Sequence, residues 1–259
     1  MRTILTLAPL IIASILAACG PGVSGGDRSS VGRYAGEILG TDGLVFYLRM
    51  DESGGSISDF FGRGIGTVEG VPIYKVLGGM HNNGGGEPQP NSAIRYDGAT
   101  CFNFGEIDAL KLQPPFSIVF MATANVIGPS VYIGDWANLA GRRGWALMAD
   151  AGPSVQFTFT YDGTTQNNYT WAPLTTNWDH YALTVDSNGN ATTYLNGNFY
   201  NNPGAPITSP IFSNTGNNIR SGCSDNFIEY LNGNLDELAI FNQSLSAQDI
   251  FRINQSRFN

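Results

Sequence analysis

Short runs of β-forming residues, separated by Asn-Gly and Asp-Gly pairs, recur through most of this chain. Both residue types of such a pair tolerate positive φ angles, so the pairs are typical of tight turns between antiparallel strands. The pairs are Asp97-Gly98, Asp162-Gly163, Asn188-Gly189 and Asn196-Gly197. The runs are residues 44–50, 93–96, 101–104, 116–124, 131–133, 145–148, 155–161, 180–185 and 191–195. This spacing predicts an all-β fold, either an antiparallel sandwich or a barrel.

Helices of crossover length do not alternate with these runs, so a parallel α/β architecture is not expected. The 259 residues are 42% hydrophobic, which is enough for one sizeable core in a single all-β domain. A brief helical turn is expected at residues 34–39, before the strands. The segment LGGMHNNGGGEPQPNS, residues 77–92, is typical of a mobile loop of low complexity inside the domain.

The stretch LNGNLDELAIFNQSLSAQDI, residues 231–250, combines three local signals. Its Asn232-Gly233 pair predicts another tight turn, and residues 235–241 alternate well enough for a strand. Ser246 and Asp249 have the spacing of a capping box, so a short C-terminal helix is expected to start there.

Two acids, Asp236 and Glu237, stand side by side at the mouth of that apolar strand. Charged residues are otherwise sparse: they make up 13% of the chain, the net charge is −8, and Lys occurs only at positions 75 and 111. The basic stripe of a nucleic-acid-binding protein is missing, so nucleic acid is not an expected partner. The acidic balance leaves two interpretations open, ordinary surface carboxylates or cation binding.

An apolar run, ILTLAPLIIASILAA, follows Arg2 and is too short for a convincing membrane span. It ends in Leu16-Ala17-Ala18-Cys19, which resembles the lipobox of bacterial lipoproteins. The resemblance implies cleavage before Cys19 and lipid on its sulfur. Gly20 in the next position implies the outer membrane, if the host is Gram-negative. The alternative is an ordinary signal peptide that contains a cysteine.

The chain is therefore divided into a lipoprotein signal peptide at residues 1–18, a Gly/Ser-rich flexible tether at residues 19–33 and one domain at residues 34–259. The expected location is extracytoplasmic, anchored to the outer membrane or cell surface through lipid only. Thiols oxidise outside the cytoplasm, so Cys101 and Cys223 are expected to form a disulfide. Two buried free thiols are the alternative.

Five stretches resemble the laminin-G-like, concanavalin-A-like jelly-roll domains of bacterial and phage surface proteins. They are YAGEILGTDGLVFYLRMDE (34–52), DFFGRGIGTVEG (59–70), AIRYDGATCFNF (93–104), NWDHYALTVDSNGNATTYLNG (177–197) and the closing stretch at 231–250. They occur in the family's order and together span residues 34–250. The resemblance implies an antiparallel β-sandwich, a jelly roll, with short N- and C-terminal helices.

The same resemblance implies a structural calcium ion. In this family the Asp of the last strand often meets the Asp-led loop near the N-terminus around such an ion, and by position these residues are Asp236 and Asp59. Ca²⁺ takes about six to eight oxygen ligands, so backbone carbonyls near residues 62–66 would complete the shell. The alternative is that Asp59 caps a turn and Asp236 accepts backbone hydrogen bonds.

Catalysis is not expected from the sequence, although some concanavalin-A-like proteins are glycosidases. Those enzymes need two carboxylates that flank the scissile bond. Glu106 and Asp108 begin the Glu-x-Asp pattern of one enzyme branch, but residues 109–111 do not supply its second Glu. His81 and His180 stand in no triad pattern, and neither a Gly-x-Ser-x-Gly stretch nor zinc-type Cys/His spacing is present. His180 is expected to be a structural residue, hydrogen-bonded across the sheet.

Carbohydrate binding depends on exposed aromatic rings that stack on sugar rings, with Asn, Asp and backbone groups at the hydroxyls. Trp136 and Trp171 lie in polar, loop-like sequence and are the main candidates, joined by Tyr161 and Tyr169. The other two tryptophans are expected in the core. The alternative for the candidates is that their rings cover the edge of the sandwich.

The sequence thus favours a non-catalytic, lipid-anchored surface protein whose jelly roll binds a glycan. A structural or adhesive module of a cell surface or virion, with a protein partner, is the alternative. A glycoside hydrolase is the third hypothesis, and it would require a second acid opposite Glu106 across a cleft.

Overall fold

The computed structural model describes residues 32–79, 91–126, 128–136, 144–152, 154–160, 165–209, 211, 218–224 and 229–258. The predicted signal peptide, its Cys19 and most of the predicted tether lie outside these ranges. Most of the predicted loop at residues 77–92 also lies outside them. No helix within the described ranges combines the length and apolar character needed to cross a membrane.

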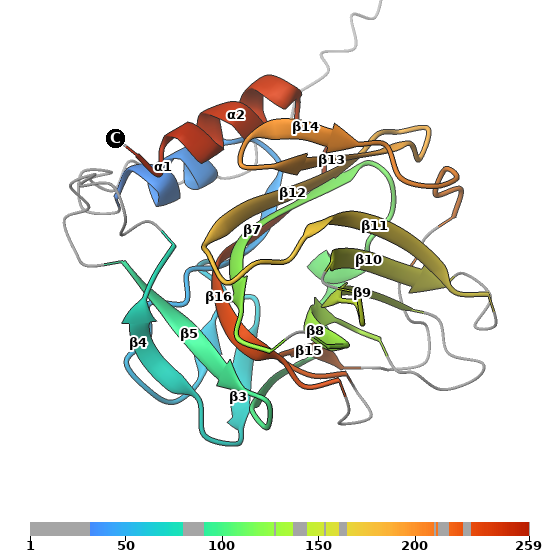
Figure 1. The fold of residues 1–259 in the computed structure, drawn as a ribbon. Coiled ribbons are helices and arrows are strands. Elements are labelled where there is room, and N and C mark those ends of the chain that lie inside the picture. The colour runs from blue at the N-terminus through green and yellow to red at the C-terminus, as the bar shows by residue number, and fades with distance from the viewer. Residues whose placement is uncertain are drawn as a thin grey trace, which may run out of the picture.

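Two antiparallel sheets form a sandwich (Figure 1). Sheet I runs in the order β14 (Asn198–Asn201), β13 (Ala191–Leu195), β12 (Asp179–Val185), β7 (Phe116–Ala124), β16 (Asn232–Phe241), β5 (Ser92–Asp97) and β4 (Ile73–Leu77), and β1 (Leu44–Leu48) also pairs with β16. Sheet II runs in the order β11 (Asn167–Pro173), β10 (Ser154–Thr160), β9 (Gly144–Ala149), β8 (Ser130–Gly134), β15 (Ile219–Ser221), β6 (Cys101–Gly105), β3 (Ile65–Glu69) and β2 (Ile57–Ser58). The predicted fold class, an antiparallel β-sandwich, is confirmed.

An aromatic-rich core fills the space between the sheets. Phe120 of sheet I stacks on Tyr181 with ring centroids 5.2 Å apart, and Trp145 of sheet II stacks on Phe157 at 5.9 Å. Such ring pairs stabilise a fold beyond the burial of their area, each by about 0.5–1.5 kcal/mol. A disulfide between Cys101 and Cys223 joins β6 to the residues after β15, as predicted.

Two short helices, α1 (Arg33–Gly40) and α2 (Ala247–Gln255), lie together on the outer face of sheet I (Figure 1). A second apolar cluster fills the space beneath them. The predicted capping box is present: the N–H of Asp249 donates to the side chain of Ser246, and the N–H of Ser246 donates to the Asp249 carboxylate, both at 3.1 Å. A cap of this kind stabilises a helix by about 1 kcal/mol.

The central strand of sheet I, β16, changes its neighbour halfway along. On one side it pairs with β7 at both ends. On the other side it pairs with β5 through residues 232–235 and then with β1 through residues 238–241. The change falls at residues 236 and 237, so the acidic pair lies where the strand passes from one neighbour to the next.

One predicted turn is wrong. Asn232-Gly233 is the start of β16, and Gly233 pairs with Ala124 of β7. A Cβ atom on Gly233 would lie 2.4 Å from the carbonyl oxygen of Thr123, so glycine is required here for the close approach of two strands. The turn between β13 and β14 is as predicted, with Asn196 in the left-handed region at φ 50°.

Candidate functional site: an acidic pair on the central strand

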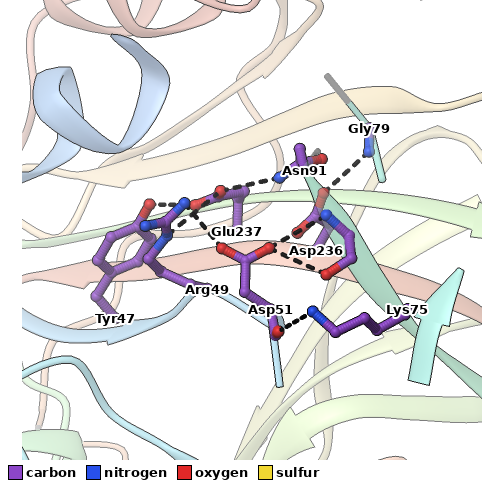
Figure 2. A network of polar contacts seen from close by, with 9 residues as sticks. Tyr47, Arg49, Asp51, Lys75, Gly79, Asn91, Asp236 and Glu237 are labelled. Carbon is purple, nitrogen blue, oxygen red and sulfur yellow. Dashed lines mark hydrogen bonds and ion pairs between the residues drawn. The ribbon is translucent and has the colours of Figure 1, made fainter. Parts of the chain in front are cut away.

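A β-bulge in β16 brings both acids into one polar network (Figure 2). Asp236 pairs with Met121 of β7, and the next paired residue, Ala239, lies opposite Val119, so β16 has one residue more than β7 in between. Glu237 takes a φ of 52°. Successive side chains of a regular strand point to opposite faces, and a bulge locally breaks that alternation. Both acidic side chains are completely buried.

Glu237 is held by side chains in and just after β1 and by the residue that precedes β5. The hydroxyl of Tyr47 donates a hydrogen bond to one carboxylate oxygen, and the amide of Asn91 donates to the other at 3.3 Å. The guanidinium of Arg49 lies 4.0 Å from the same oxygen as Asn91 and also pairs with Asp51 at 2.8 Å. A cation and two neutral donors therefore compensate this buried carboxylate.

Asp51 extends the network to the edge of the sheet (Figure 2). Its carboxylate accepts the N–H and the hydroxyl of Ser92 at 3.1 and 3.2 Å, and its carbonyl accepts the ammonium of Lys75 at 3.3 Å. The network thus connects β16 with β1, β4 and β5, which are the elements that meet where β16 changes partner.

Asp236 has different surroundings. One oxygen accepts the N–H of Gly79 at 2.9 Å, and the other is buried with no hydrogen-bond partner among the described residues. Burial, together with the nearby charge of Glu237, raises the pKa of Asp236 well above its usual range. A Cβ atom on Gly78 would lie 1.8 Å from the side-chain oxygen of Asn91 and 2.8 Å from Asp236, so this approach requires glycine.

Asp59 does not join this network. Its carboxylate accepts three backbone N–H groups, those of Tyr47 at 2.8 Å, Phe61 at 3.2 Å and Arg63 at 3.1 Å. These contacts cap the turn that follows β2 and fix it to β1. The turn-capping role that the sequence left open for Asp59 is therefore its role in the structure.

Asp59 and Asp236 share no hydrogen-bond partner among the described contacts, and a calcium ion between them stays a prediction. The three N–H groups at Asp59 direct the positive ends of their dipoles to the oxygens that a cation would need. In the part of the chain that the structure places, no group of three or more His, Cys, Asp or Glu side chains is arranged to hold a metal ion. We derive no role for calcium from these residues.

The aromatic candidates of β11 lie in the core, so the expectation that they are exposed is wrong. Tyr169 and Trp171 are each 2% exposed. Trp171 meets Phe120 edge-on at 5.8 Å, and Tyr169 meets Phe159 at 5.1 Å. The polar neighbours that suggested a loop, such as Asn168, occupy the alternate, outward positions of a strand. Neither ring offers a free face to a sugar.

The other two candidates differ from each other. Trp136 is 7% exposed and packs with Val131, Ala146 and Met148 in a small apolar cluster away from the main core. Its predicted exposure is therefore also wrong. Tyr161 lies outside the described residues. Polar residues flank these rings in the sequence, which favoured a loop. A strand with one exposed face also carries polar residues at alternate positions, so this pattern does not distinguish a strand from a loop.

The residues examined for catalysis do not converge on a common site. Glu106 and Asp108 are both exposed, and Asp108 lies in the short helix η3 (Asp108–Leu110), where it pairs with Lys111 at 2.5 Å. His180 is completely buried on β12 and bonds to Asn196 through its backbone: its N–H donates to the side-chain oxygen at 2.9 Å, and its carbonyl accepts the N–H of Asn196 at 2.7 Å. Its ring nitrogens have no hydrogen-bond partner in the described part of the chain.

Two exposed aromatic rings that the sequence did not single out lie on β14, at one edge of sheet I. Phe199 is 62% exposed and Tyr200 is 41% exposed. Tyr200 is the extra residue of a bulge, because Phe199 pairs with Tyr194 while Asn201 pairs with Thr193. The Asn196-Gly197 turn just before them was the sequence signal for these rings, because a tight turn is followed by a strand whose side chains are held in place.

The two-sheet sandwich and a match to a family model both indicate a concanavalin A-like domain. The family model described as "Concanavalin A-like lectin/glucanases superfamily" matches residues 121–251, just over half of the chain. The chain belongs to this superfamily, in its laminin-G-like branch. A search by sequence finds no significant match among curated proteins.

Solved structures with the same fold come from several bacterial proteins. Domain 4 of AbnA, a GH43 extracellular arabinanase from Geobacillus stearothermophilus solved in complex with arabinotriose, has a TM-score of 0.61 at 18% identity, covering 82% of this chain and 98% of that domain. A structure of botulinum neurotoxin type C, whose cell entry depends on two ganglioside molecules, has a TM-score of 0.61 at 14% identity. The binding domain of Paraclostridial Mosquitocidal Protein 1 has a TM-score of 0.60 at 16% identity.

The match to the toxin structures is partial. This chain is covered to 83% and 84%, but it spans only 51% of the botulinum type C chain and 53% of the mosquitocidal binding domain. At these identities the similarity establishes the fold alone. The site residues described above come from this chain's own contacts.

Proposed function

We propose that this protein is a non-catalytic carbohydrate-binding module displayed at a bacterial surface by a lipid anchor. The observation that carries the binding proposal is the pair of exposed rings on β14, Phe199 and Tyr200, on a hairpin fixed by the Asn196-Gly197 turn. Large apolar rings usually lie inside a fold, so adjacent exposed rings at a sheet edge indicate a contact surface.

The chemistry of this edge suits a sugar. An aromatic ring offers a flat apolar face to the C–H groups of a pyranose or furanose ring. Exposed amides flank the rings at Asn198 and Asn202, and an amide both donates to and accepts from hydroxyl groups. The structural neighbours include a domain solved with arabinotriose and a toxin that uses gangliosides, which supports glycan binding as the general function.

The lipid anchor is proposed from the sequence alone. The lipobox-like residues 16–19 would place a lipidated Cys19 at the membrane, with residues 20–32 as the tether before α1. A fully extended tether of this length reaches about 45 Å. Such a tether would leave the glycan-binding edge free to reach sugars on the cell's own surface or on a neighbouring one.

A second function, adhesion to a protein partner, has one specific observation in its favour. β4 is the last strand of sheet I on the side opposite β14, and Ile73 and Leu77 on it are exposed. An edge strand with exposed apolar residues can pair with a strand of another chain. A glycan-binding experiment separates the two functions because the two edges lie at opposite ends of the sheet.

The test is a glycan array that includes arabino-oligosaccharides and ganglioside oligosaccharides. Phe199→Ala and Tyr200→Ala should each weaken binding about tenfold, equivalent to about 1.4 kcal/mol. Phe60→Ala, which removes an exposed ring far along the chain from β14, is the matched control and should bind as the parent does. No binding by the folded parent, or equal loss in the control, would refute the proposal.

A further inference from the structure

Four buried polar side chains meet beneath the two helices, on the outer side of sheet I. They are Tyr34 of α1, His180 of β12, Asp236 of β16 and Arg257, which follows α2. The first three are completely buried, and Arg257 is nearly so. None of the four belongs to the proposed glycan-binding edge, and the inference below does not depend on that function.

Each of these side chains has at least one polar atom without a hydrogen-bond partner in the described part of the chain. The atoms are the hydroxyl of Tyr34, both ring nitrogens of His180, one oxygen of Asp236 and Nε of Arg257. Buried polar groups in folded proteins nearly always find a partner, either in the protein or in ordered water. Five such atoms in one region therefore indicate a common ligand.

The four side chains are close to one another. The rings of Tyr34 and His180 meet edge-on with centroids 6.0 Å apart. Gly79 connects the other two, because its N–H donates to Asp236 at 2.9 Å and its carbonyl accepts Nη2 of Arg257 at 3.4 Å. Asn196 connects His180 with Arg257, because its side-chain oxygen accepts the backbone N–H of His180 at 2.9 Å and Nη1 of Arg257 at 3.2 Å. His180 and Asp236 both pair with Met121 of β7, one from each side.

The mixture of donors and acceptors selects the ligand. Nε of Arg257 can only donate, whereas the unpartnered oxygen of Asp236 accepts when the carboxylate is ionised and can donate when its raised pKa keeps it protonated. Burial and the charge of Arg257 lower the pKa of His180, so its ring is neutral near pH 7 and carries one donor and one acceptor nitrogen. A metal cation would meet N–H groups here, and an anion would meet Asp236. Water can donate and accept at once, and so it satisfies every group.

We propose that this cluster is an internal hydration site, in which ordered water molecules bridge Tyr34, His180, Arg257 and Asp236. The waters connect α1 and the segment after α2 to the central strand of sheet I. Arg257 completes the wall of the site through its other nitrogens, which bond to Asn196, to Asn254 and to the carbonyl of Trp178. Buried waters of this kind make about three hydrogen bonds each and are costly to remove.

A high-resolution crystal structure of the protein, grown with calcium in the solution, tests the site directly. The expected result is density for water within about 2.7–3.2 Å of at least two of the five atoms. A peak with anomalous signal and oxygen distances of about 2.3–2.6 Å would identify calcium and overturn the proposal. Absence of density, with the side chains bonded directly to one another, would also overturn it.

A pair of tyrosine variants tests the site by stability. Tyr34→Phe removes a water-bridged hydroxyl and should lower Tm by about 2–4 °C, the shift for one lost hydrogen bond in a domain of this size. Tyr132 also has a buried hydroxyl without a described partner, but its ring packs on Phe120 at 5.6 Å in the apolar core. Tyr132→Phe should therefore leave Tm unchanged or raise it, and equal losses in both variants would refute the hydration site.

Discussion

Asp236 and Arg257 hold the same residue from opposite sides: the carboxylate accepts the N–H of Gly79, and the guanidinium donates to its carbonyl. Asp236 belongs to β16, the central strand of sheet I, and Arg257 follows helix α2. Gly79 is thereby fixed between the middle of the sheet and the end of the domain. The buried acid therefore holds the segment after β4 against the central strand.

The first prediction concerns the glycines at this contact. Gly78→Ala should lower the free energy of unfolding by about 1–3 kcal/mol, because the new methyl group overlaps the side chain of Asn91. Gly36→Ala is the matched control, since a Cβ atom there meets no atom within 4 Å. Alanine in helix α1 should raise the free energy of unfolding by about 0.5–1 kcal/mol. Urea unfolding of both variants measures the difference. A neutral Gly78→Ala would contradict the contact.

The second prediction concerns acid sensitivity at His180. Its pKa is lowered by burial and by Arg257, so the unfolded chain binds a proton that the folded chain excludes. The stability that neutral His180 contributes is fully present above about pH 6.5, the pKa of histidine in the unfolded chain, and is lost as pH falls below that value. The free energy of unfolding then falls by up to about 1.4 kcal/mol per pH unit. His180→Gln should lack this component. Unfolding free energies of both proteins from pH 7 to pH 5 should diverge, and parallel curves would disprove it.

The third prediction concerns metal removal. Because backbone N–H groups occupy the carboxylate of Asp59, neither EDTA nor added calcium should change Tm. An ion that binds only the folded state would raise Tm with its concentration. Differential scanning calorimetry with and without chelator makes the comparison. A chelator-dependent fall in Tm that Asp59→Asn abolishes would restore the calcium site implied by the family resemblance.

The fourth prediction concerns the disulfide. Cys101 and Cys223 are 122 residues apart in sequence, so their bond restricts the unfolded chain over a long loop. Replacing both with serine should lower the free energy of unfolding by about 2–5 kcal/mol. Peptide mapping by mass spectrometry under non-reducing conditions should recover the two cysteines in one linked fragment. Two free thiols in the folded protein purified without reductant would contradict the bond.

The fifth prediction concerns the anchor. Cys19→Ala should abolish labelling by a radioactive or clickable fatty acid and release the protein from the membrane fraction. Cys101→Ala serves as the control, because it removes a cysteine of the folded domain and should leave the label in place. Label retained by Cys19→Ala would show that Cys19 is not the lipidation site.

The fold was largely predictable because its signals are local. Hairpin turns such as Asn196-Gly197 and the capping box at Ser246 depend on a few neighbouring residues, and the structure contains both. The Asn232-Gly233 pair shows the limit of this reasoning. The same dipeptide serves as a turn in one place and as a close strand contact in another, and only the position of β7 decides which.

The polar site was less predictable because its partners are distant in sequence. The adjacent acids in an apolar strand signalled a special feature, and the bulge explains it. Their partners, such as Tyr47 and Gly79, come from segments more than 150 residues away, and no local pattern identifies them. Exposure of Trp171 was misjudged for a related reason, since its burial depends on packing against Phe120 of the other sheet.

The position of β16 has a consequence for folding. This strand follows the other described strands in chain order, yet it lies between β7 on one side and β5 and β1 on the other. Without residues 232–241, sheet I is divided into three separate parts: β14–β13–β12–β7, β5–β4 and β1. The sheet can therefore close only when its last strand joins residues far away in sequence, and non-local pairing of this kind makes folding slow.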